Sequence, residues 1–453
     1  MSNQLQLSRR RFLWLTGAGT AAMGAMSLVP SLRASESEDA FAIAQDAYIW
    51  GLPIVCIRWY FEWAHQNNIP LNRFTGNPNL SVPSDKAVGP CMNLLYGFAW
   101  LDLTQEPLVL HVPETSDRYY SVQLIDEYSN DFAYVGRRTT GTKEGKYLIV
   151  GPSWTGSVPQ GLTKIESLTN RVFVLTRTLV KGDDDLSAAQ EIQRQYALAP
   201  LSQYPRIPSA DLHFLQTIPI PDFSTLGIQF FDQLSAALAT LPVQAEDVAS
   251  LRRFAKIGIG PGAHPSQTPD EALRSALLEA VPAANERIIH ADVAADVNGW
   301  SVNYHVTNFI KDPLLKASAN LYGPGTHVAQ EALYFIAKPE EPLNGGVHNY
   351  VLRFTAGALP PVNAFWSLSA YEGREFYLIP NPINRYAIGT VTSGLQYNPD
   401  GSLEIQLQKN APEHGTSNWL PVAGGPFHLI LRTYQPQPTL ISGGYRPSAL
   451  QKV

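Results

Sequence analysis

Two blocks of short apolar segments, each interrupted by turn-forming residues, are the feature that most restricts the fold of this chain. The first block holds segments at 107–112, 119–125, 132–135, 146–150 and 171–177, and the second holds segments at 334–337, 350–354, 364–370, 376–379, 403–408 and 427–433. Gly, Pro, Asp or Asn stands in nearly every gap, as in Asn398-Pro-Asp-Gly401, where Gly meets the turn's demand for positive φ. Short strands at this spacing predict a β-sandwich for the first block and a jelly roll for the second.

The stretch between the two blocks has a helical period and no strand signal. Apolar residues such as Phe230, Leu234 and Leu238 recur at helical spacing. Helices are predicted at 186–196, 223–241, 248–257, 269–281 and 284–297. Thr268-Pro-Asp-Glu271 has the pattern of a capping box with Pro at the first helical position. This stretch therefore predicts a helical insert between two β units.

A further pair of helices is predicted at 40–50 and 53–65, with Gly51-Leu-Pro53 ending the first and opening the second. The fold class is then mainly β with a helical insert, an α+β multidomain protein with an immunoglobulin-like β-sandwich, a helical domain and a C-terminal jelly roll. The predicted segments are a signal peptide at 1–34, N-terminal helices at 35–92, the sandwich at 93–185, the helical domain at 186–325 and the jelly roll at 326–453.

The N-terminus predicts an export signal. Ser8-Arg-Arg-Arg-Phe-Leu13 is a twin-arginine motif, an apolar run follows it to Val29, and Leu32-Arg-Ala34 is a plausible cleavage site. A single membrane anchor is the alternative, but the run is short and rich in Gly and Ala, which favours cleavage. No second run approaches the ~18 apolar residues of a membrane span. We expect a periplasmic protein, cleaved near residue 34, with no stable membrane span afterwards.

Composition excludes two classes of protein. Of 453 residues, 45% are hydrophobic and only 16% are charged, which provides apolar material for cores and argues against disorder. The net charge is −6 and Lys and Arg are scattered, so we expect no nucleic-acid partner. Cys56 and Cys91 are the only cysteines. An oxidising compartment permits a bridge between them, and the sequence leaves open whether they meet.

Several long motifs resemble a bacterial family built from two domains of unknown function, numbered 1254 and 1214. The N-terminal resemblance rests on 99–103, 106–113, 118–120 with Gln123 and Asp126, 138–141 and 147–152; the C-terminal one rests on 359–368, 381–386, 397–403, 418–421 and 425–427. The resemblance implies an immunoglobulin-like sandwich, a helical domain and a jelly roll in one chain. It carries no established reaction or residue roles.

The first β block carries a cluster of polar residues that could do chemistry. Tyr119, Ser121 and Gln123 share one face of a strand, and Asp126 and Asn130 lie near its end. A carboxylate beside phenols and an Arg could act in general acid–base catalysis. The structural alternative is a solvated strand edge with Arg118 paired to a local acid.

The second β block carries a matching cluster around Asn381-Pro-Ile-Asn-Arg-Tyr386. Arg385 could hold a carboxylate or another anion. The structural alternative is that Asn381 and Asn384 form turns and that Arg385 ties two loops together. Asn363 and Trp366 precede this cluster and Trp419 follows it, a mixture of polar and aromatic groups found in pockets for sugars or ring compounds.

Metal and nucleophile motifs give weak signals. His327 and Glu331 lie four residues apart and Glu413 precedes His414, but lone histidines are more often structural, so no metal site is assigned and the cofactor is unknown. The chain has no Gly-x-Ser-x-Gly motif of a hydrolase. Gly258-Ile-Gly-Pro-Gly262 lacks the strand–helix setting of a phosphate loop and is interpreted as a helix end and turn.

Two functions are compatible with these clusters. The first is an enzyme of hydrolase or lyase type with an interdomain pocket for a small organic or sugar-like substrate. Its candidate catalytic residues are Asp126, Tyr119, Arg385 and Tyr386, and its candidate substrate-binding residues are Arg118, Gln123, Asn130, Asn363, Trp366, Asn381 and Trp419. The second is a non-catalytic periplasmic protein that binds a carbohydrate or another ligand. We expect a homo-oligomer, because jelly rolls often associate through exposed sheets.

Overall fold

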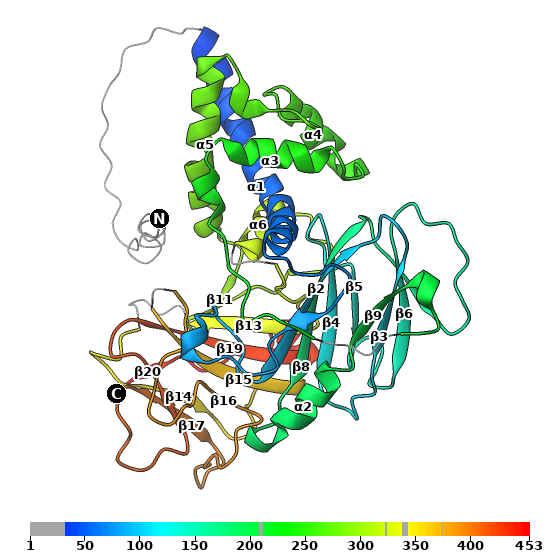
Figure 1. Ribbon diagram of the computed structural model, residues 1–453. Helices are drawn as coiled ribbons and strands as arrows, with labels where there is room; N and C mark the ends of the chain where they lie inside the picture. The colour runs from blue at the N-terminus through cyan, green and yellow to red at the C-terminus, as the bar shows by residue number, and fades with distance from the viewer. Residues whose placement is uncertain (1–31, 208–211, 322–323, 338–342, 374) are drawn as a thin grey trace, which may run out of the picture. The chain divides into compact units, whose positions relative to one another are not determined.

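The computed structural model describes residues 32–207, 212–321, 324–337, 343–373 and 375–453 (Figure 1). The twin-arginine motif and the apolar run after it lie outside these residues. The predicted fold class is confirmed, because the chain is mainly β with several sheets and a helical insert. Two compact units divide the described part of the chain, one mostly helical (up to residue 59, 221–292 and 311–324) and one mostly β (60–220, 293–310 and 325–453). This division differs from the predicted segments, since residues 186–220 belong to the β unit.

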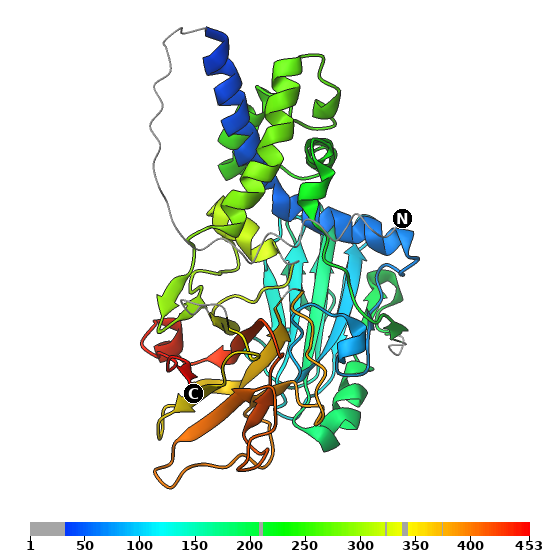
Figure 2. The same ribbon diagram turned by 90° about the vertical axis from the view of Figure 1, so that its left-hand side faces the viewer.

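The helical unit is built on the long N-terminal helix, and its other helices come from two later stretches of the chain. They are α1 (Leu32–Gln66, which ends in the β unit), α3 (Gln229–Leu238), α4 (Val248–Ala255), α5 (Glu271–Ile289) and α6 (Pro313–Asn320). Figure 2 shows α1 and α5 side by side. Tyr48 of α1 packs on Phe230 of α3, with ring centroids 4.3 Å apart.

The predicted break at Gly51-Leu-Pro53 is wrong, because α1 continues through Pro53. Every residue from 51 to 57 is buried, so packing on all sides of the helix outweighs the hydrogen bond that Pro53 removes. Gly51 has a separate role. A Cβ at this position would lie 2.6 Å from Leu234 Cδ2, so Gly lets α3 approach α1 closely.

The described residues contain one helical segment that is long and apolar enough to cross a membrane, Ala40–Gln66, with a mean hydropathy of 1.5. The expectation that no such run follows the leader is therefore wrong by length and composition. The most apolar window of this segment is 72% buried inside the fold. Such burial is typical of a helix in a protein core, so the segment is weak support for a membrane span.

Two further expectations about the helical stretch are wrong. The helices predicted at 269–281 and 284–297 form a single helix, α5, with Pro282 inside it. Its N-cap is Asp270, whose carboxylate accepts hydrogen bonds from the N–H groups of Ala272 and Leu273, in place of the expected capping box at Thr268. The stretch also contains strands, namely β9 (Ala197–Pro200), β10 (His213–Phe214), β11 (Ala295–Val297) and β12 (Trp300–Val302).

The β unit consists of two sandwiches, each with an outer and an inner sheet. In the N-terminal sandwich, the outer sheet has the order β7-β6-β3-β9 and the inner sheet has the order β10-β1-β2-β8-β4-β5. Their strands are β1 (Thr75–Gly76), β2 (Leu94–Asp102), β3 (Leu108–Val112), β4 (Tyr120–Asp126), β5 (Ala133–Gly136), β6 (Gly145–Val150), β7 (Thr163–Glu166) and β8 (Arg171–Leu179). Helix α2 (Leu186–Gln193) follows β8.

The C-terminal sandwich has the inner sheet β11-β12-β13-β19-β15-β16 and the outer sheet β18-β17-β14-β20. Its strands are β13 (Ala332–Ala337), β14 (Tyr350–Phe354), β15 (Val362–Glu372), β16 (Ala387–Gly389), β17 (Leu403–Gln408), β18 (Trp419–Pro421), β19 (Phe427–Pro436) and β20 (Gln451–Lys452). Helix α7 (Pro438–Ile441) follows β19. The strand predicted at 376–379 is absent, and Leu378 forms only a single bridge to Tyr371.

Strand alternation gives each inner sheet two buried faces. On β4, Tyr120, Val122 and Leu124 enter the apolar core of the N-terminal sandwich. On β19, Leu429 and Leu431 enter the core of the C-terminal sandwich. The residues between them point the other way, and those of the two inner sheets meet. The layer between the inner sheets is therefore a third buried region, separate from the cores of the two sandwiches.

Aromatic rings form the apolar part of the layer between the inner sheets. The Tyr119 ring lies 5.5 Å from Phe365 and 5.3 Å from Tyr434. Phe365 and Tyr434 stack with centroids 4.3 Å apart. Cys91 lies in the same cluster as a free, buried thiol, and Cys56 is also free and buried. The bridge that the sequence left open is therefore not formed.

Candidate functional site

Two arginines are buried in the layer between the inner sheets. Arg177 on β8 and Arg432 on β19 are only 6% and 5% exposed. Arg177 donates to Gln123 Oε1 at 2.7 Å and to the Gly325 carbonyl at 2.6 Å. Arg432 donates to Tyr371 Oη and to the Gly89 carbonyl, both at 2.6 Å. All four acceptors are neutral, so the described residues give neither guanidinium a carboxylate partner.

Aromatic rings face both guanidiniums. Arg177 lies over Tyr96 at 5.7 Å, and Arg432 lies over Tyr371 at 5.5 Å and over Tyr334 at 6.0 Å. Burial raises the pKa of Tyr334 although both guanidiniums act to lower it. Burial likewise acts to lower the pKa of Arg432, but the surrounding phenols and the Cys91 thiol outweigh it and that pKa is raised. The layer thus combines fixed cations with neutral phenols that can donate hydrogen bonds.

A buried acid is linked to Arg177 through Gln123. Gln123 Nε2 donates to Asp131 Oδ1 at 2.8 Å, and Tyr134 Oη donates to Asp131 Oδ2 at 3.0 Å. Burial raises the pKa of Asp131 to about 7, although these two hydrogen bonds act to lower it. A carboxyl group with a pKa near neutrality can either give or accept a proton at neutral pH. Asp131 is therefore suited to acid–base chemistry.

His327 adds a neutral base to the same network. Its Nδ1 lies 3.3 Å from Tyr134 Oη, and the side chain is 1% exposed. Burial lowers the pKa of His327 well below its usual value, and the positive charges of Arg177 and Arg138 act in the same direction. Among the described residues, Nε2 has no hydrogen-bond partner. When Tyr134 donates to Asp131, Nδ1–H donates to Tyr134 and Nε2 carries the free lone pair.

Glu331 completes the layer and is paired. Its Oε1 accepts a hydrogen bond from Tyr119 Oη at 2.9 Å, and its Oε2 accepts one from Arg138 Nε. The carboxylate is 1% exposed, so the bond and the ion pair offset its loss of hydration. Glu331 and His327 lie in residues 324–331, which directly precede β13 and have no regular secondary structure. This segment therefore makes hydrogen bonds to the N-terminal inner sheet and leads directly into β13 of the C-terminal inner sheet.

The structure brings together two of the residues that the sequence proposed for the site. Tyr119, which directly precedes β4, and Gln123 within it point to the same side, as the alternation predicts, and both reach the layer. Asp126 instead closes a turn, where its carboxylate accepts from Asn130 N at 2.9 Å and from Asn130 Nδ2 at 3.0 Å. Arg118 pairs with Asp185 and donates to the Leu179 carbonyl at 2.6 Å. These bonds are structural, and the functional roles proposed for Asp126, Asn130 and Arg118 stay predictions.

The candidates of the second β block make the hydrogen bonds expected if they only stabilise turns and loops. Arg385 Nη1 donates to the carbonyls of residues 416, 417 and 419 and so ties two loops together. The Asn381 side chain bonds to backbone groups of residues 379 and 385, as a turn-forming residue does. Tyr386 Oη donates to Asn384 Oδ1 at 3.2 Å. Tyr119 and Asp126 lie at opposite ends of β4, whereas Arg385 and Tyr386 share the loop before β16. The four have different partners, and their joint catalytic role stays a prediction.

The remaining candidates lie in the interior or at the surface of the C-terminal sandwich. Trp366 lies in the core of the C-terminal sandwich, with its ring 5.3 Å from Phe354. Trp419 is 1% exposed, and its Nε1 donates to the Gln408 carbonyl at 2.8 Å. The Asn363 side chain is exposed at the start of β15. None of these positions lies in the layer of Arg177, so their binding roles stay predictions as well.

The two buried arginines were not predicted as site residues, although a signal for them exists in the sequence. On β8, Phe173, Leu175 and Leu179 share the face of Arg177, and a charged residue at an apolar position of the alternation is unusual. Arg432 has the same relation to Ile430 and Tyr434 on β19. Asp131 gave no such signal, and His327 was noted only for its four-residue spacing from Glu331. The described residues contain no group of three His, Cys, Asp or Glu side chains that could hold a metal ion.

The comparisons with known proteins agree with the two-sandwich division. Residues 71–200 match a family described as protein of unknown function (DUF1254), and residues 331–438 match protein of unknown function (DUF1214). The first match covers most of the N-terminal sandwich and the second most of the C-terminal one. No curated protein matches the chain.

Two solved structures match the chain, and the first is similar to it in fold. The VPA0106 protein from Vibrio parahaemolyticus has a TM-score of 0.66 and 23% sequence identity, and the match covers 91% of this chain and 100% of that one. An uncharacterised protein from Burkholderia cenocepacia has a TM-score of 0.42 and 14% identity over 92% of this chain and 96% of that one. The chain has both domains in the same order as the motifs indicated, and it belongs to the family that pairs DUF1254 with DUF1214.

Proposed function

We propose that the protein is an enzyme of hydrolase or lyase type that acts on a small organic or sugar-like substrate bearing a carboxylate. The observation that carries this proposal is the pair of buried guanidiniums, Arg177 and Arg432, which bond only neutral acceptors among the described residues. A buried cation that bonds only neutral acceptors keeps part of its cost of lost hydration, and an anionic ligand would offset that cost. Arg is also the residue that best matches a carboxylate in geometry.

The neighbouring groups supply what such a reaction needs. A guanidinium that holds the carboxylate stabilises negative charge as it develops on the adjacent carbon. His327 Nε2, or the Asp131 carboxylate, accepts the proton released from that carbon. A neutral phenol such as Tyr334 gives a proton to the leaving oxygen. This favours a lyase: a C–H and a C–O bond break, a C=C bond forms, and the proton lost from carbon remains on the base.

The placement of these groups supports the same proposal. His327 and the Gly325 carbonyl lie on a segment without regular structure, and this segment packs against strands β4, β5 and β8. Catalytic groups are often carried by loops that a rigid scaffold positions. Asp131, Gln123 and Arg177 are held by the inner sheet itself. The site therefore combines fixed binding groups with a loop-borne base.

The test uses purified protein and a panel of small carboxylates and uronates. Elimination is followed by the ultraviolet absorbance of the new conjugated double bond, and hydrolysis by the release of product in NMR spectra. We expect turnover of at least one carboxylate substrate, with a loss of about 100-fold or more in His327→Gln and in Asp131→Asn. Glu166→Gln, an exposed position on β7, is the matched control and should keep full activity.

The alternative is a non-catalytic ligand-binding protein. It predicts that carboxylates bind to the wild type without turnover, and that His327→Gln binds them equally well. Loss of binding in Arg177→Gln with no turnover in any protein would favour this alternative. Carboxylate turnover that is unchanged in Arg177→Gln, His327→Gln and Asp131→Asn would exclude the layer as the site.

Export is part of the proposed function and can be tested separately. The motif Ser8-Arg-Arg-Arg-Phe-Leu13 is the basis for proposing export to the periplasm with cleavage near residue 34. Replacing Arg9 and Arg10 by Lys should retain the protein in the cytoplasm, as cell fractionation would show. Sedimentation of the mature protein tests the expected homo-oligomer, and a monomer at all concentrations would contradict it.

A further inference from the structure

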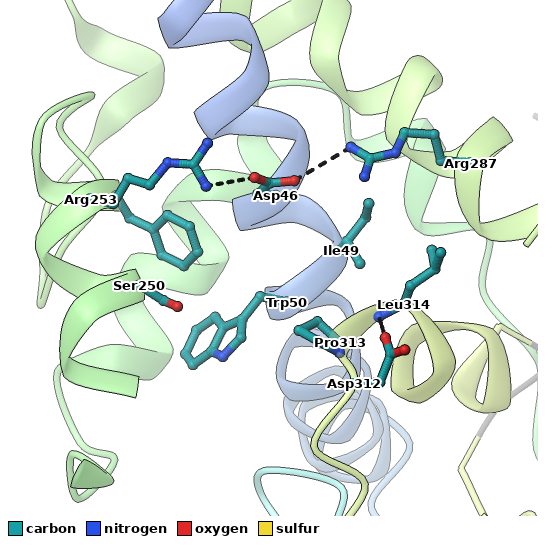
Figure 3. A pocket seen from close by; sticks show the side chains of 10 residues that line it. Asp46, Ile49, Trp50, Ser250, Arg253, Arg287, Asp312, Pro313 and Leu314 are labelled. Carbon is teal, nitrogen blue, oxygen red and sulfur yellow. Dashed lines mark hydrogen bonds and ion pairs between the residues drawn. The ribbon is translucent and has the colours of Figure 1, made fainter. Parts of the chain in front are cut away.

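A pocket of ≈ 300 Å³ lies inside the helical unit, independent of the layer between the inner sheets (Figure 3). Its walls come from four helices. Asp46, Ile49 and Trp50 belong to α1, Ser250, Arg253 and Phe254 to α4, Arg287 to α5, and Asp312, Pro313 and Leu314 to the start of α6. The volume is at the lower end of the usual range for small-molecule sites, about 300 to 1,000 Å³.

The polar end of the pocket is a clamp of two guanidiniums on one carboxylate. Arg253 Nη1 lies 2.6 Å from Asp46 Oδ2, and Arg287 Nη1 lies 3.4 Å from Asp46 Oδ1. Figure 3 shows the two arginines reaching Asp46 from opposite sides. Arg287 Nη1 also donates to Gln45 Oε1 at 2.9 Å. One carboxylate therefore stands between two cations, and the clamp carries an excess positive charge.

Most donors of the clamp remain available. Among the described residues, each guanidinium bonds only through Nη1, which leaves Nε and Nη2 of both arginines. The side chains of Arg253 and Arg287 are 42% and 48% exposed, so a ligand from solvent can reach them. Asp312 also lines the pocket, and its Oδ1 accepts from Leu314 N and Leu315 N as the N-cap of α6, away from the clamp in Figure 3. The clamp thus offers more donors than acceptors.

The other end of the pocket is apolar and rigid. Trp50 Nε1 donates to Asp247 Oδ1 at 3.0 Å, which fixes the orientation of the indole ring. The Phe254 ring lies 5.7 Å from the indole. Ile49, Pro313 and Leu314 add aliphatic surface. A ligand that fits this pocket has an acceptor-rich anionic group at one end and an aliphatic or aromatic body at the other.

We propose that this pocket binds a small organic carboxylate, with its carboxylate between Arg253 and Arg287 and its apolar body against Trp50. The ligand carboxylate takes the guanidinium donors that Asp46 leaves open, in the bidentate geometry that Arg favours. An inorganic anion would contact the two arginines but would leave the apolar part of the lining without a partner. The inference does not depend on the function proposed for the layer of Arg177.

The test probe is para-fluorophenylacetate, and its neutral amide is the matched ligand. Fluorine NMR line broadening measures binding of each to the full mature protein. We expect the carboxylate to bind the wild type and the amide to bind about tenfold or more weakly, because the amide lacks the charge that the guanidiniums stabilise. Equal binding of the two ligands, or no binding of the carboxylate, would overturn the proposal.

The matched variants are two neighbouring arginines on α4. Arg253→Gln removes one arm of the clamp, whereas Arg252→Gln makes the same charge change at an exposed position outside the pocket. We expect para-fluorophenylacetate to bind about tenfold or more weakly in the first variant and as in the wild type in the second. Binding that survives Arg253→Gln but is lost in Arg177→Gln would place the ligand in the layer and contradict the pocket.

A third variant changes affinity in the opposite direction. Asp46→Asn removes the internal carboxylate that competes for the guanidiniums, so para-fluorophenylacetate should bind several-fold more tightly. A purely structural role of the clamp predicts no gain in affinity. Melting temperatures of all three variants separate altered binding from altered folding, and a folded Asp46→Asn protein with unchanged or weaker binding would count against the proposal.

Discussion

Tyr119 and Glu331 are separated by 212 residues in the sequence, yet Tyr119 Oη donates a hydrogen bond of 2.9 Å to Glu331 Oε1. The bond joins the inner sheet of the N-terminal sandwich to the segment that leads into the inner sheet of the C-terminal one. Both groups are almost completely buried. Since a buried carboxylate needs its partners, this contact helps to hold the two sandwiches in one β unit.

Tyr119→Phe tests that contact. The change removes one hydrogen bond to a buried carboxylate and leaves the aromatic packing on Phe365 and Tyr434 in place. We expect the free energy of unfolding in urea to fall by about 1.5 to 3 kcal/mol. Tyr397→Phe is the control, because Tyr397 is 53% exposed, and should change stability very little. Equal effects in the two variants would show that the bond contributes nothing specific.

Asp131 makes stability depend on pH with a definite sign. Its pKa rises from 3.8 to about 7 on folding, through burial, so the folded protein binds a proton that the unfolded chain releases in this range. The stability that this bound proton contributes is fully present below about pH 4 and is lost as pH rises through about 7. Asp131→Asn removes this titration.

The measurement is the free energy of unfolding of both proteins between pH 4 and 7.5. As pH rises over this range, the wild type should lose ~1 kcal/mol or more of its free energy of unfolding relative to Asp131→Asn. Glu166→Gln provides the reference for a solvent-exposed acid. A difference that does not change with pH, or that changes in the opposite sense, would contradict the raised pKa of Asp131.

Gly325 is required for its backbone conformation and for the space around it. Its φ is +109°, and a Cβ would lie 2.6 Å from Leu175 Cδ2, beside the carbonyl that accepts from Arg177. Gly325→Ala should destabilise the protein by ~2 to 4 kcal/mol in urea unfolding. Gly394→Ala is the matched control, with φ +75° and open space, and should cost about 1 to 2 kcal/mol. Similar values for both would show that the contact is unimportant.

Arg385→Ala distinguishes a structural from a catalytic role of this residue. Loss of the bonds from Nη1 to the three carbonyls should lower the free energy of unfolding by ~1 to 3 kcal/mol. Carboxylate binding and turnover per folded molecule should stay as in the wild type. Arg446→Ala, at an exposed position, serves as the reference. A stable variant that has lost turnover would instead restore Arg385 as a catalytic residue.

Local rules were sufficient for much of the fold. Most of the predicted strands lie where alternation and turn residues indicated, because apolar side chains at period two need a sheet with a buried face. The same rule placed Tyr119 and Gln123 on one face of the predicted strand at 119–125 before any contact was known. Local rules failed at Pro53, where a proline normally ends a helix. Burial on every side of α1 outweighs that preference, and burial is a property of the assembled unit.

The sequence by itself determined the two β blocks, the helical insert between them and the family motifs, since each depends on residues close together in the chain. Only the tertiary structure decided which polar groups meet. His327 and Tyr134 are 193 residues apart, and no local pattern relates them, yet their side chains lie 3.3 Å apart once the inner sheets pack. The same packing removes water from Arg177 and Asp131. Loss of hydration sets the charge and pKa of these groups, so their chemistry exists only in the folded chain.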